Sequence, residues 1–528
     1  MKALVGGKWI DGFLDYHRGP EDYRIKVLAC LTVASVDELY FVRSRSARLV
    51  WNYIQEIGFR DVYRKIVSRR DERFRNEKFL SVGLGIVHET GISSNLCEGD
   101  RVMFIAPAHP KCMERLVLPA DLVRSMDLAL PVEVQDEAIV HSGSSVALPG
   151  CLEKLKGWSA FSGNPLRDLS SAFDAVQAML MDPSAWIMAR RFSVDTRDMP
   201  LERRDGRKAS GSRRKQGVLF GYGNYAKVIV IPNIVPYVEI SCIHEIDPLQ
   251  IPLEENFGSM WDTADSLRPE EQYDAYFLAG FHHSHAPLAV EALKFGACAV
   301  VEKPLAVDNT QLSELLTAMA QSSGAFYSCF HKRYQVFNQY AYSDLHLGPG
   351  HPVSYHCIVY EVPLPLRHWY RWSNSKSRLV SNGCHWIDHF LYLNDYCQVS
   401  MTDVFIARDG IINCSMELKN GSLFTMVLTD QGSERIGMQD YIELRANGVT
   451  VRMRNGALYE AESGDRFLRK FKINRMDSYR RMYRSIGQKI VQGLSGDSIE
   501  SVRVSTDAVL QLERQLKNVL DNENSVWV

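Results

Sequence analysis

Two side chains able to exchange protons stand in well-defined surroundings, although they are far apart in the chain. Lys303 lies in Val301-Glu302-Lys303-Pro304-Leu305, which follows an apolar run and precedes a helical pattern. About eighty residues later, His385 lies in Gly383-Cys384-His385-Trp386-Ile387-Asp388. A lysine and a histidine brought together by the fold could donate or accept protons at one substrate atom. We therefore predict that this pair forms the centre of a catalytic site.

A glycine-rich turn upstream predicts a dinucleotide site, with a tight structural turn as the alternative. Gly221-Tyr222-Gly223-Asn224-Tyr225-Ala226 lies between an apolar run and a helical pattern. Glycine lets the backbone approach a pyrophosphate, and the N–H groups that open the helix point at that anion. Glu245, 22 positions after Gly223, ends the next apolar run and would bind the ribose hydroxyls. Because a carboxylate repels a 2′-phosphate, NAD is expected rather than NADP; Asp247, before Pro248, is the competing candidate.

Strands and helices alternate after residue 217, which predicts a parallel sheet covered by helices on both faces. Strand-like runs occupy 217–220, 238–244, 274–279 and 298–301. The helix after the glycine turn is expected to end at Pro232, and the next one to begin at Pro287 and end at Gly296. A further helix is predicted by four apolar residues on one face, namely Leu312, Leu315, Leu316 and Met319.

The pattern after residue 350 is that of an antiparallel sheet. Asn-Gly pairs at 420–421, 447–448 and 455–456 lie between β-like runs such as Leu423 to Leu428. Both residues of such a pair tolerate positive φ, so each pair predicts the turn of a β-hairpin. Two helices are expected to follow, one with apolar positions from Tyr479 to Ile490 and one from Val509 to Val519.

Four segments occur in an order and spacing that resemble the Gfo/Idh/MocA oxidoreductases, a family that includes glucose–fructose oxidoreductase and inositol dehydrogenase. They are Tyr273–Ala279, His282–Leu288, Glu302-Lys303-Pro304 and Gly383-x-His385-x-x-Asp388, and the resemblance covers about 217–525. It implies an α/β Rossmann parallel sheet in 217–340 that binds NAD. It also implies an α+β domain with an open antiparallel sheet and C-terminal helices in 341–528, with the substrate at the seam.

The resemblance implies roles for individual residues. Lys303 would polarise or protonate the substrate oxygen, and partial burial beside a cationic nicotinamide would lower its pKa toward neutrality. His385 would act as general acid/base. The cofactor would contact Gly221, Gly223, Asn224, Tyr225, Ala226, Glu245, His282, His285, Glu302 and Lys303. The substrate would contact Arg333, His368, Trp369 and Asp388.

One position departs from the family's pattern. Ser381 stands four residues before His385, where many members carry an aspartate that assists the histidine. A serine holds no charge, so reduction becomes more plausible than removal of an alcohol proton. Asn382 and Asp388 are the nearest polar substitutes. The histidines at 282, 283 and 285 lack a carboxylate or cysteine at ligand spacing, so no metal is expected.

The first 202 residues resemble the GroES-like domain of medium-chain alcohol dehydrogenases. The likeness rests on Gly83-Leu84-Gly85 and Gly99-Asp100-Arg101-Val102 within 24–130, and 165–200 would be its returning piece. Ala34 stands where a zinc-binding cysteine is expected, and a basic helical stretch, 43–75, replaces the zinc lobe. We therefore expect a mostly β, degenerate and metal-free module, structural or oligomerising, followed by a basic linker, 203–216. Such chains resemble the bi-domain oxidoreductases that accompany bacterial surface-polysaccharide genes.

Composition restricts the classes of partner. The 528 residues are 46% apolar and 23% charged with a formal net charge of −2, so neither nucleic acid nor an anionic membrane should attract the chain. The basic run 203–215 lacks interleaved aromatic residues that would stack on bases. Eleven cysteines without a Cys-x-x-Cys pair, and no secretory or membrane-spanning pattern, favour a cytoplasmic protein. A homo-oligomer with a small-molecule substrate is expected.

The leading hypothesis is an NAD(H)-dependent oxidoreductase that moves hydride to or from a sugar or nucleotide-sugar carbonyl or hydroxyl, in surface-polysaccharide or secondary-metabolite biosynthesis. The same fold hosts imine and conjugated C=C reductases, which need only one proton donor and so suit Ser381. A catalytically silent NAD-binding scaffold is the third hypothesis. The degenerate N-terminal module favours a scaffold, whereas the presence of both Lys303 and His385 argues against it.

Overall fold

The computed structural model describes residues 214–245, 260–262, 272–364, 369–433 and 436–526 of the C-terminal part of the chain. Of the first 213 residues it describes 2–5, 8–11, 23–35, 47–65, 79–90, 95–106, 115–118, 123–126, 140–142, 173–174, 177 and 189–191. His368, Asp247 and most of the predicted linker lie outside the described residues.

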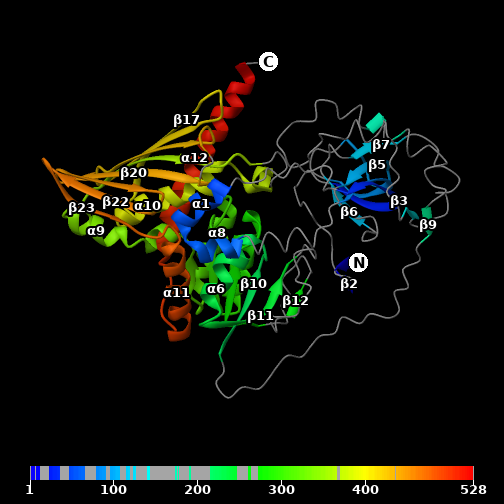
Figure 1. The fold of residues 1–528 in the computed structure, drawn as a ribbon, viewed down its shortest axis with the longest axis horizontal. Helices are drawn as coiled ribbons and strands as arrows, with labels where there is room; N and C mark the ends of the chain where they lie inside the picture. The colour runs from blue at the N-terminus through cyan, green and yellow to red at the C-terminus, as the bar shows by residue number, and fades with distance from the viewer. Residues whose placement is uncertain are drawn as a thin grey trace.

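The first sheet of the C-terminal part is parallel throughout, as the strand–helix alternation predicted (Figure 1). Its strands are β10 (Lys215–Phe220), β11 (Val238–His244), β12 (Met260–Asp262), β13 (Ala275–Leu278), β14 (Cys298–Val301) and β15 (Phe326–Ser328). Their order is β12-β11-β10-β13-β14-β15, the Rossmann order. The strand order reverses between β10 and β13, so a ligand crevice is expected at the carboxyl ends of these two strands.

Alternate residues of these strands enter two different cores because side chains in a strand point to opposite faces. Phe220 and Leu278 pack with α7 (His285–Lys294) on one face. Leu219 and Phe277 pack on the other face with α6 (Ile231–Ile234) and α11 (Asp477–Gln492). α8 (Asn309–Gln321) follows β14 and packs along α7. The sheet is therefore covered on both faces, as predicted.

The helix after the glycine turn does not end at Pro232, contrary to the sequence prediction. Helical backbone runs from 224 to 234, as a π-helical stretch, Ala226–Val230, followed by α6. Pro232 stands within the first two positions of α6, where a missing backbone N–H costs no helical hydrogen bond. The change of helical register at residue 230 thus makes the proline compatible with a continuing helix.

The second sheet has eight strands in the order β17-β18-β19-β16-β20-β21-β22-β23. Their bounds are β16 (Ser354–Tyr360), β17 (Val399–Ile406), β18 (Ile412–Leu418), β19 (Leu423–Thr429), β20 (Gln439–Ala446), β21 (Val449–Arg454), β22 (Leu458–Ser463) and β23 (Arg466–Lys472). The three predicted Asn-Gly turns join β18 to β19, β20 to β21 and β21 to β22. Positive φ at Asn447 and Gly448 permits the second of these turns. The sheet is mixed, not wholly antiparallel, because β16 and β19 are parallel.

Helices pack against this sheet and join it to the Rossmann part. They are α9 (Phe337–Asp344), α10 (Cys384–Leu393) and the C-terminal α12 (Ile499–Val526), which Figure 1 shows in red beside β17. α10 is buried along nearly its whole length, so His385 is held in the core between the two sheets. No described helix has both the length and the apolar character that a membrane span requires.

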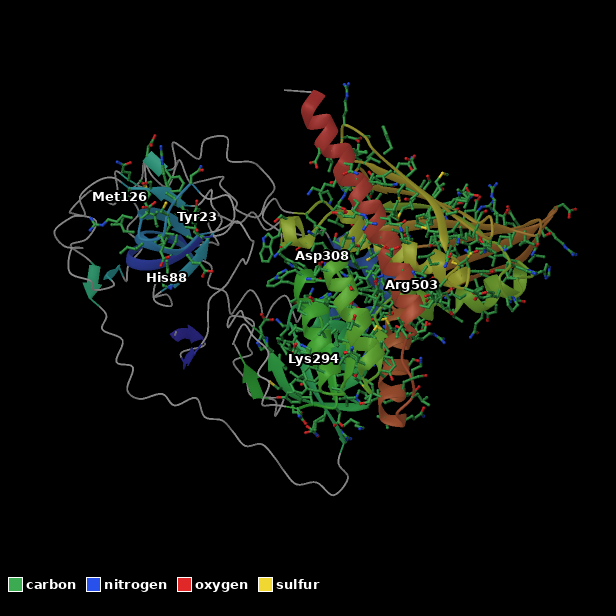
Figure 2. The ribbon with its side chains drawn as sticks, turned by 180° about the vertical axis from the view of Figure 1, so that it is seen from behind. Tyr23, His88, Met126, Lys294, Asp308 and Arg503 are labelled. Atoms are coloured by element: carbon green, nitrogen blue, oxygen red, sulfur yellow. The ribbon has the colours of Figure 1, made fainter. Side chains whose placement is uncertain are left out.

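The described strands of the N-terminal half form a sheet with the order β7-β5-β4-β3-β8-β9, to which β6 adds beside β3, and a separate pair, β1-β2. Their bounds are β1 (Lys2–Val5), β2 (Lys8–Asp11), β3 (Tyr23–Ser35), β4 (Phe79–Glu89), β5 (Arg101–Ala106), β6 (Arg115–Leu118), β7 (Val123–Ser125), β8 (Val140–Ser142) and β9 (Ala189–Arg191). Figure 2 shows Tyr23, His88 and Met126 together on this sheet, away from Lys294 and Arg503. The GroES-like identity of the module stays a prediction.

Candidate active site

Lys303 lies at the carboxyl edge of the parallel sheet, two residues after β14, and a cis peptide bond joins it to Pro304. Its Nζ donates a hydrogen bond of 2.7 Å to the backbone oxygen of Ser381. It also lies 3.4 Å from the phenol oxygen of Tyr370 and 5.4 Å from the centre of that ring. The lysine therefore connects three segments that are far apart in the sequence, namely the strand end, the stretch before α10 and the loop that carries Tyr370.

Burial and the neighbouring side chains act on the pKa of Lys303 in opposite directions. Burial alone would lower the pKa, but Tyr370, Cys384 and Glu302 together raise it above the ordinary value of a lysine. The free protein therefore holds this side chain as an ammonium. Such a group suits the stabilisation of negative charge on an oxygen better than it suits proton donation.

His385 is buried in the first turn of α10, directly after a π-helical stretch, Leu379–Gly383. Burial first, then the positive charges of Lys303 and Lys332, lower its pKa well below the ordinary value. The imidazole is therefore neutral, with one nitrogen able to accept a proton and the other able to donate one. Its Nδ1 has no hydrogen-bond partner among the described residues, which is unusual for a buried polar atom.

The ring of His331 lies beside His385, with 4.8 Å between the ring centres. Tyr479 stacks on the opposite face of His331 at 3.8 Å, and Ser478 shares a hydrogen bond of 3.1 Å with its Nδ1. Both partners belong to α11. The position of the His331 ring, and through it the wall of the His385 site, is thus set by a helix near the C-terminus.

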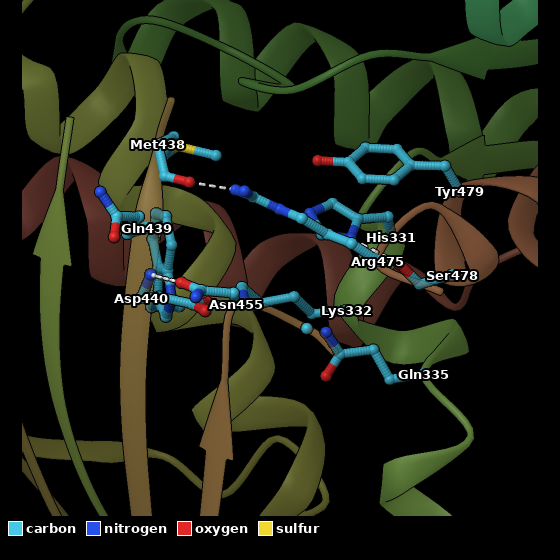
Figure 3. Close-up of a pocket in the computed structure, with 12 residues that line it drawn as sticks. His331, Lys332, Gln335, Met438, Gln439, Asp440, Asn455, Arg475, Ser478 and Tyr479 are labelled. Carbon is cyan, nitrogen blue, oxygen red and sulfur yellow. Dashed lines mark hydrogen bonds and ion pairs between the residues drawn. The ribbon is translucent and has the colours of Figure 1, made fainter. Parts of the chain in front are cut away.

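His331 lines a small cavity, and Figure 3 shows Arg475 extending between Met438 and Tyr479 at its wall. The buried ion pair of Lys332 and Asp440, 2.5 Å long, forms another part of the wall. The cavity measures about 20 Å³, which is the space of about one or two water molecules. It is therefore too small to be the site of a sugar.

The glycine turn follows β10 closely and places Glu245 beside its backbone. Gly221 has φ of 90°, and a Cβ there would lie 2.6 Å from the oxygen of Ala279, so only glycine fits between the two crevice strands. A Cβ on Gly223 would meet nothing within 4 Å, which leaves its backbone open to a ligand. Glu245 accepts a hydrogen bond of 2.6 Å from the backbone N–H of Tyr222. The predicted ribose-binding carboxylate and the predicted phosphate-binding turn thus lie side by side.

Glu302 points away from the crevice toward α11. Its carboxylate accepts a hydrogen bond from the phenol of Tyr483, and the phenol of Tyr225 in the glycine turn also lies within hydrogen-bond reach. Burial raises the pKa of Glu302, although both phenols and Lys303 oppose the shift. Glu302 therefore fixes Lys303 and the glycine turn to the same helix, and its carboxylate is occupied by these contacts.

The loop after β13 is covered by aromatic side chains. His285 lies 2.9 Å from the oxygen of Pro304 and 3.2 Å from that of Gly280, so it ties the Lys303 turn to this loop. His282 is buried and lies 4.5 Å, ring centre to ring centre, from both Trp369 and Tyr370. No cluster of three or more potential metal ligands occurs among the described residues.

Arg333 and Asp388, which the resemblance implied as substrate ligands, form a buried ion pair. The carboxylate of Asp388 accepts hydrogen bonds of 2.9 and 2.5 Å from Arg333 and one of 2.7 Å from Ser505. Asp388 is 0% exposed, and Arg333 also lies 3.3 Å from Asp497. The burial of Asp388 and its three hydrogen bonds within the protein point to a structural role for the pair, which we propose.

Two residues of the site, His331 and Glu361, escaped the sequence analysis. Glu361 follows β16 and accepts a hydrogen bond of 2.5 Å from Asn382, the residue after Ser381. Burial raises the pKa of Glu361, while Asn382, Arg378 and Lys303 oppose the shift. The carboxylate that Ser381 cannot supply is thus present nearby on another element. Tyr370, by contrast, lies in a Pro-flanked aromatic run that did give a signal in the sequence.

Neither a protein-family model nor a curated protein matches the sequence, whereas solved structures match its fold. A dehydrogenase from Chromobacterium violaceum is 14% identical and covers 60% of this chain and 99% of its own, with a TM-score of 0.51. KijD10, a 3-ketoreductase from Actinomadura kijaniata in complex with NADP and TDP-benzene, is 17% identical over 57% and 98%, with a TM-score of 0.49. WlbA dehydrogenase from Bordetella pertussis, in complex with NADH and UDP-GlcNAcA, is 16% identical over 58% and 97%, with a TM-score of 0.48.

These comparisons define the fold class and nothing finer. The Chromobacterium violaceum dehydrogenase shares the fold, a Rossmann sheet followed by a mixed sheet, over 60% of this chain. The fold expected from the resemblance is therefore confirmed for the C-terminal part.

Proposed function

We propose that this chain is an NAD(H)-dependent oxidoreductase that acts on a carbonyl or hydroxyl group of a sugar or nucleotide sugar. The observation that carries the proposal is the meeting of Lys303, Tyr370 and the backbone of Ser381 at the carboxyl edge of the Rossmann sheet. The glycine turn with its open Gly223 and adjacent Glu245 supplies the dinucleotide site. When bound there, the nicotinamide would give or take the hydride.

The side chains of the site would handle the charge and the proton of that reaction. In the reducing direction, the Lys303 ammonium stabilises the negative charge that develops on the carbonyl oxygen. A proton reaches that oxygen from the phenol of Tyr370 or from the imidazole of His385, which is buried and neutral. The aromatic rings of Trp369 and Tyr370, packed on His282, would cover the reacting carbon and exclude water.

The cofactor test is a fluorescence titration with NADH and NADPH, preceded by identification by mass of any nicotinamide released on denaturation. We expect NADH to bind more tightly, because Glu245 lies beside the glycine turn and repels a 2′-phosphate. Glu245→Ser should reduce this preference by about tenfold, a loss of about 1.4 kcal/mol of discrimination. Gln216→Ser is the control, because Gln216 lies at the end of β10 away from the glycine turn. An unchanged preference would assign the choice of cofactor to another residue. If denaturation releases no nicotinamide and neither nucleotide binds, the oxidoreductase proposal fails.

The expected homo-oligomer is also proposed. The eight-stranded sheet exposes large apolar side chains of β16 and β17, namely Ile358, Met401 and Phe405, each more than half exposed. Apolar side chains gathered on one sheet face are typical of an interface. Sedimentation velocity should show more than one copy, and Phe405→Asp should shift the protein toward the monomer. A monomeric wild-type protein would refute this proposal.

The imine or C=C reductase hypothesis predicts other substrates for the same site. An imine or conjugated C=C reductase would also use one proton donor, and a screen of imines and enones beside keto sugars would separate it from the leading proposal. The cytoplasmic location and the role in surface-polysaccharide or secondary-metabolite biosynthesis rest on the sequence alone. Localisation of a tagged protein and the chemistry of the accepted substrate would test them.

A further inference from the structure

A helical segment of the N-terminal half packs against the C-terminal part of the chain (Figure 1). It comprises α1 (Ala47–Ile57) and the helical residues 59–65, and we refer to 47–65 as the N-terminal clamp. Asp61 forms an ion pair with Arg480 of α11. Asn474, just before α11, donates a hydrogen bond of 2.9 Å to the backbone oxygen of Ile57. More than four hundred residues of sequence separate the partners of each contact.

The clamp contributes apolar side chains to the core of the predicted cofactor domain. Ile57 and Val62 are 3% and 7% exposed and belong to the same buried cluster as Tyr222, Ile229 and Met482. Burial of two aliphatic side chains at this contact stabilises the clamp against α6 and α11. Asp61 is itself 5% exposed, so its charge is withdrawn from water; Arg480 of α11 compensates it, and Arg64 lies 4.0 Å away within the clamp. A predicted boundary at residue 202 would therefore divide one continuous core.

α11 carries contacts to the candidate site besides its contacts to the clamp. Tyr483 donates to Glu302, the residue before Lys303. Tyr479 stacks on His331, which lies against His385, and its ring is 6.3 Å from that of Tyr225 in the glycine turn. A displacement of α11 would therefore be transmitted to the lysine, to the histidine and to the nucleotide turn together.

We propose that the N-terminal clamp positions the active site through α11, with Asp61 and Arg480 as positioning residues. Residues 47–65 would then belong to the catalytic body and not to a separable module. This positioning role goes beyond the proposed function. It depends on that function only in the choice of NADH as the probe. It requires that the Asp61–Arg480 pair influence groups that neither residue touches.

The test uses the full-length chain with three variants, namely Asp61→Ala, Arg480→Ala and the charge-swapped Asp61→Arg/Arg480→Asp. Glu56→Gln is the matched control, because Glu56 pairs with the exposed Lys472 across the same contact at a looser 3.8 Å. NADH affinity is measured by fluorescence titration well below the melting temperature. Hydrogen exchange is followed in the peptides that contain α11 and Lys303.

We expect each single alanine variant to weaken NADH binding by about tenfold, or about 1.4 kcal/mol, and to speed exchange in both peptides. The charge-swapped variant should recover much of the affinity, and the control should stay within about twofold of the wild type. A lower melting temperature with wild-type NADH affinity and wild-type exchange at Lys303 would overturn the proposal, because the clamp would then only cover α11.

The outcome also separates this inference from the proposed function. If the wild-type protein binds neither NADH nor NADPH, the cofactor proposal fails. The hydrogen-exchange measurement then tests the positioning role of the clamp by itself. Faster exchange of the Lys303 peptide in the Asp61 and Arg480 variants, reversed by the charge swap, would still support the clamp. Exchange confined to residues 47–65 would overturn it.

Discussion

Lys303→Ala should lower turnover by about 10³-fold, the range expected when a group that stabilises transition-state charge is removed. The Lys303 ammonium is fixed by the backbone oxygen of Ser381 and lies beside Tyr370, so it is held in place before any substrate arrives. Its removal leaves the glycine turn intact, and NADH affinity should therefore change by no more than about threefold, below 1 kcal/mol. Initial rates on a panel of keto sugars and sugar nucleotides, with NADH titrations, measure both quantities.

The size of the effect of Tyr370→Phe identifies the proton donor. If the phenol supplies the proton, this variant should lose about 10² of turnover, whereas an effect below about threefold would leave that role to His385. Lys294→Ala, which removes an exposed lysine paired with Glu291, is the matched control and should behave as the wild type. Turnover of Lys303→Ala equal to that of the wild type would remove Lys303 from the mechanism.

Local sequence rules predicted those parts of the fold that local geometry determines. The Asn-Gly turns at 447–448 and 455–456 formed hairpins with positive φ at both residues, and the turn at 420–421 has positive φ at Gly421. β11 and β14 lie at the residues where apolar runs were recognised. The glycine turn was identified because its backbone constraints, such as the positive φ of Gly221, lie within six residues. Pro232 failed as a helix terminator because a π-helical stretch changed the register before it, which no local rule indicates.

Contacts between distant segments were not predictable in the same way. Tyr370 meets Lys303 across 67 residues, and Glu361 meets Asn382 across 21 residues. Neither spacing has a period that a single sequence shows. The same limitation explains why 47–65 was assigned to a separate module, since its partner helix lies beyond residue 470. Nor could the sequence show that Arg333 and Asp388, which the resemblance assigns to the substrate, form a buried ion pair with each other.

The second large effect concerns the stability that the buried Arg333–Asp388 pair provides. Asp388→Ala should lower the free energy of unfolding by about 3 kcal/mol, because it leaves the buried guanidinium of Arg333 without its main partner. The side chain of Arg333 is only 7% exposed, and Asp497, 3.3 Å away, offers partial compensation. Urea unfolding at constant pH measures the change. The double variant Arg333→Met/Asp388→Leu should recover most of the loss, since it removes both charges and keeps the volume.

Kinetics distinguish this structural role from a substrate contact. If Asp388 only pairs with Arg333 and Ser505, the folded Asp388→Ala protein should keep the wild-type KM at temperatures where it remains native. A substrate ligand would show the reverse result, with KM raised and the free energy of unfolding nearly unchanged. The double variant makes the contrast sharper, because a substrate role would abolish its binding even when its stability is restored. The buried geometry of the carboxylate predicts the first result, since all the hydrogen bonds of Asp388 are made within the protein.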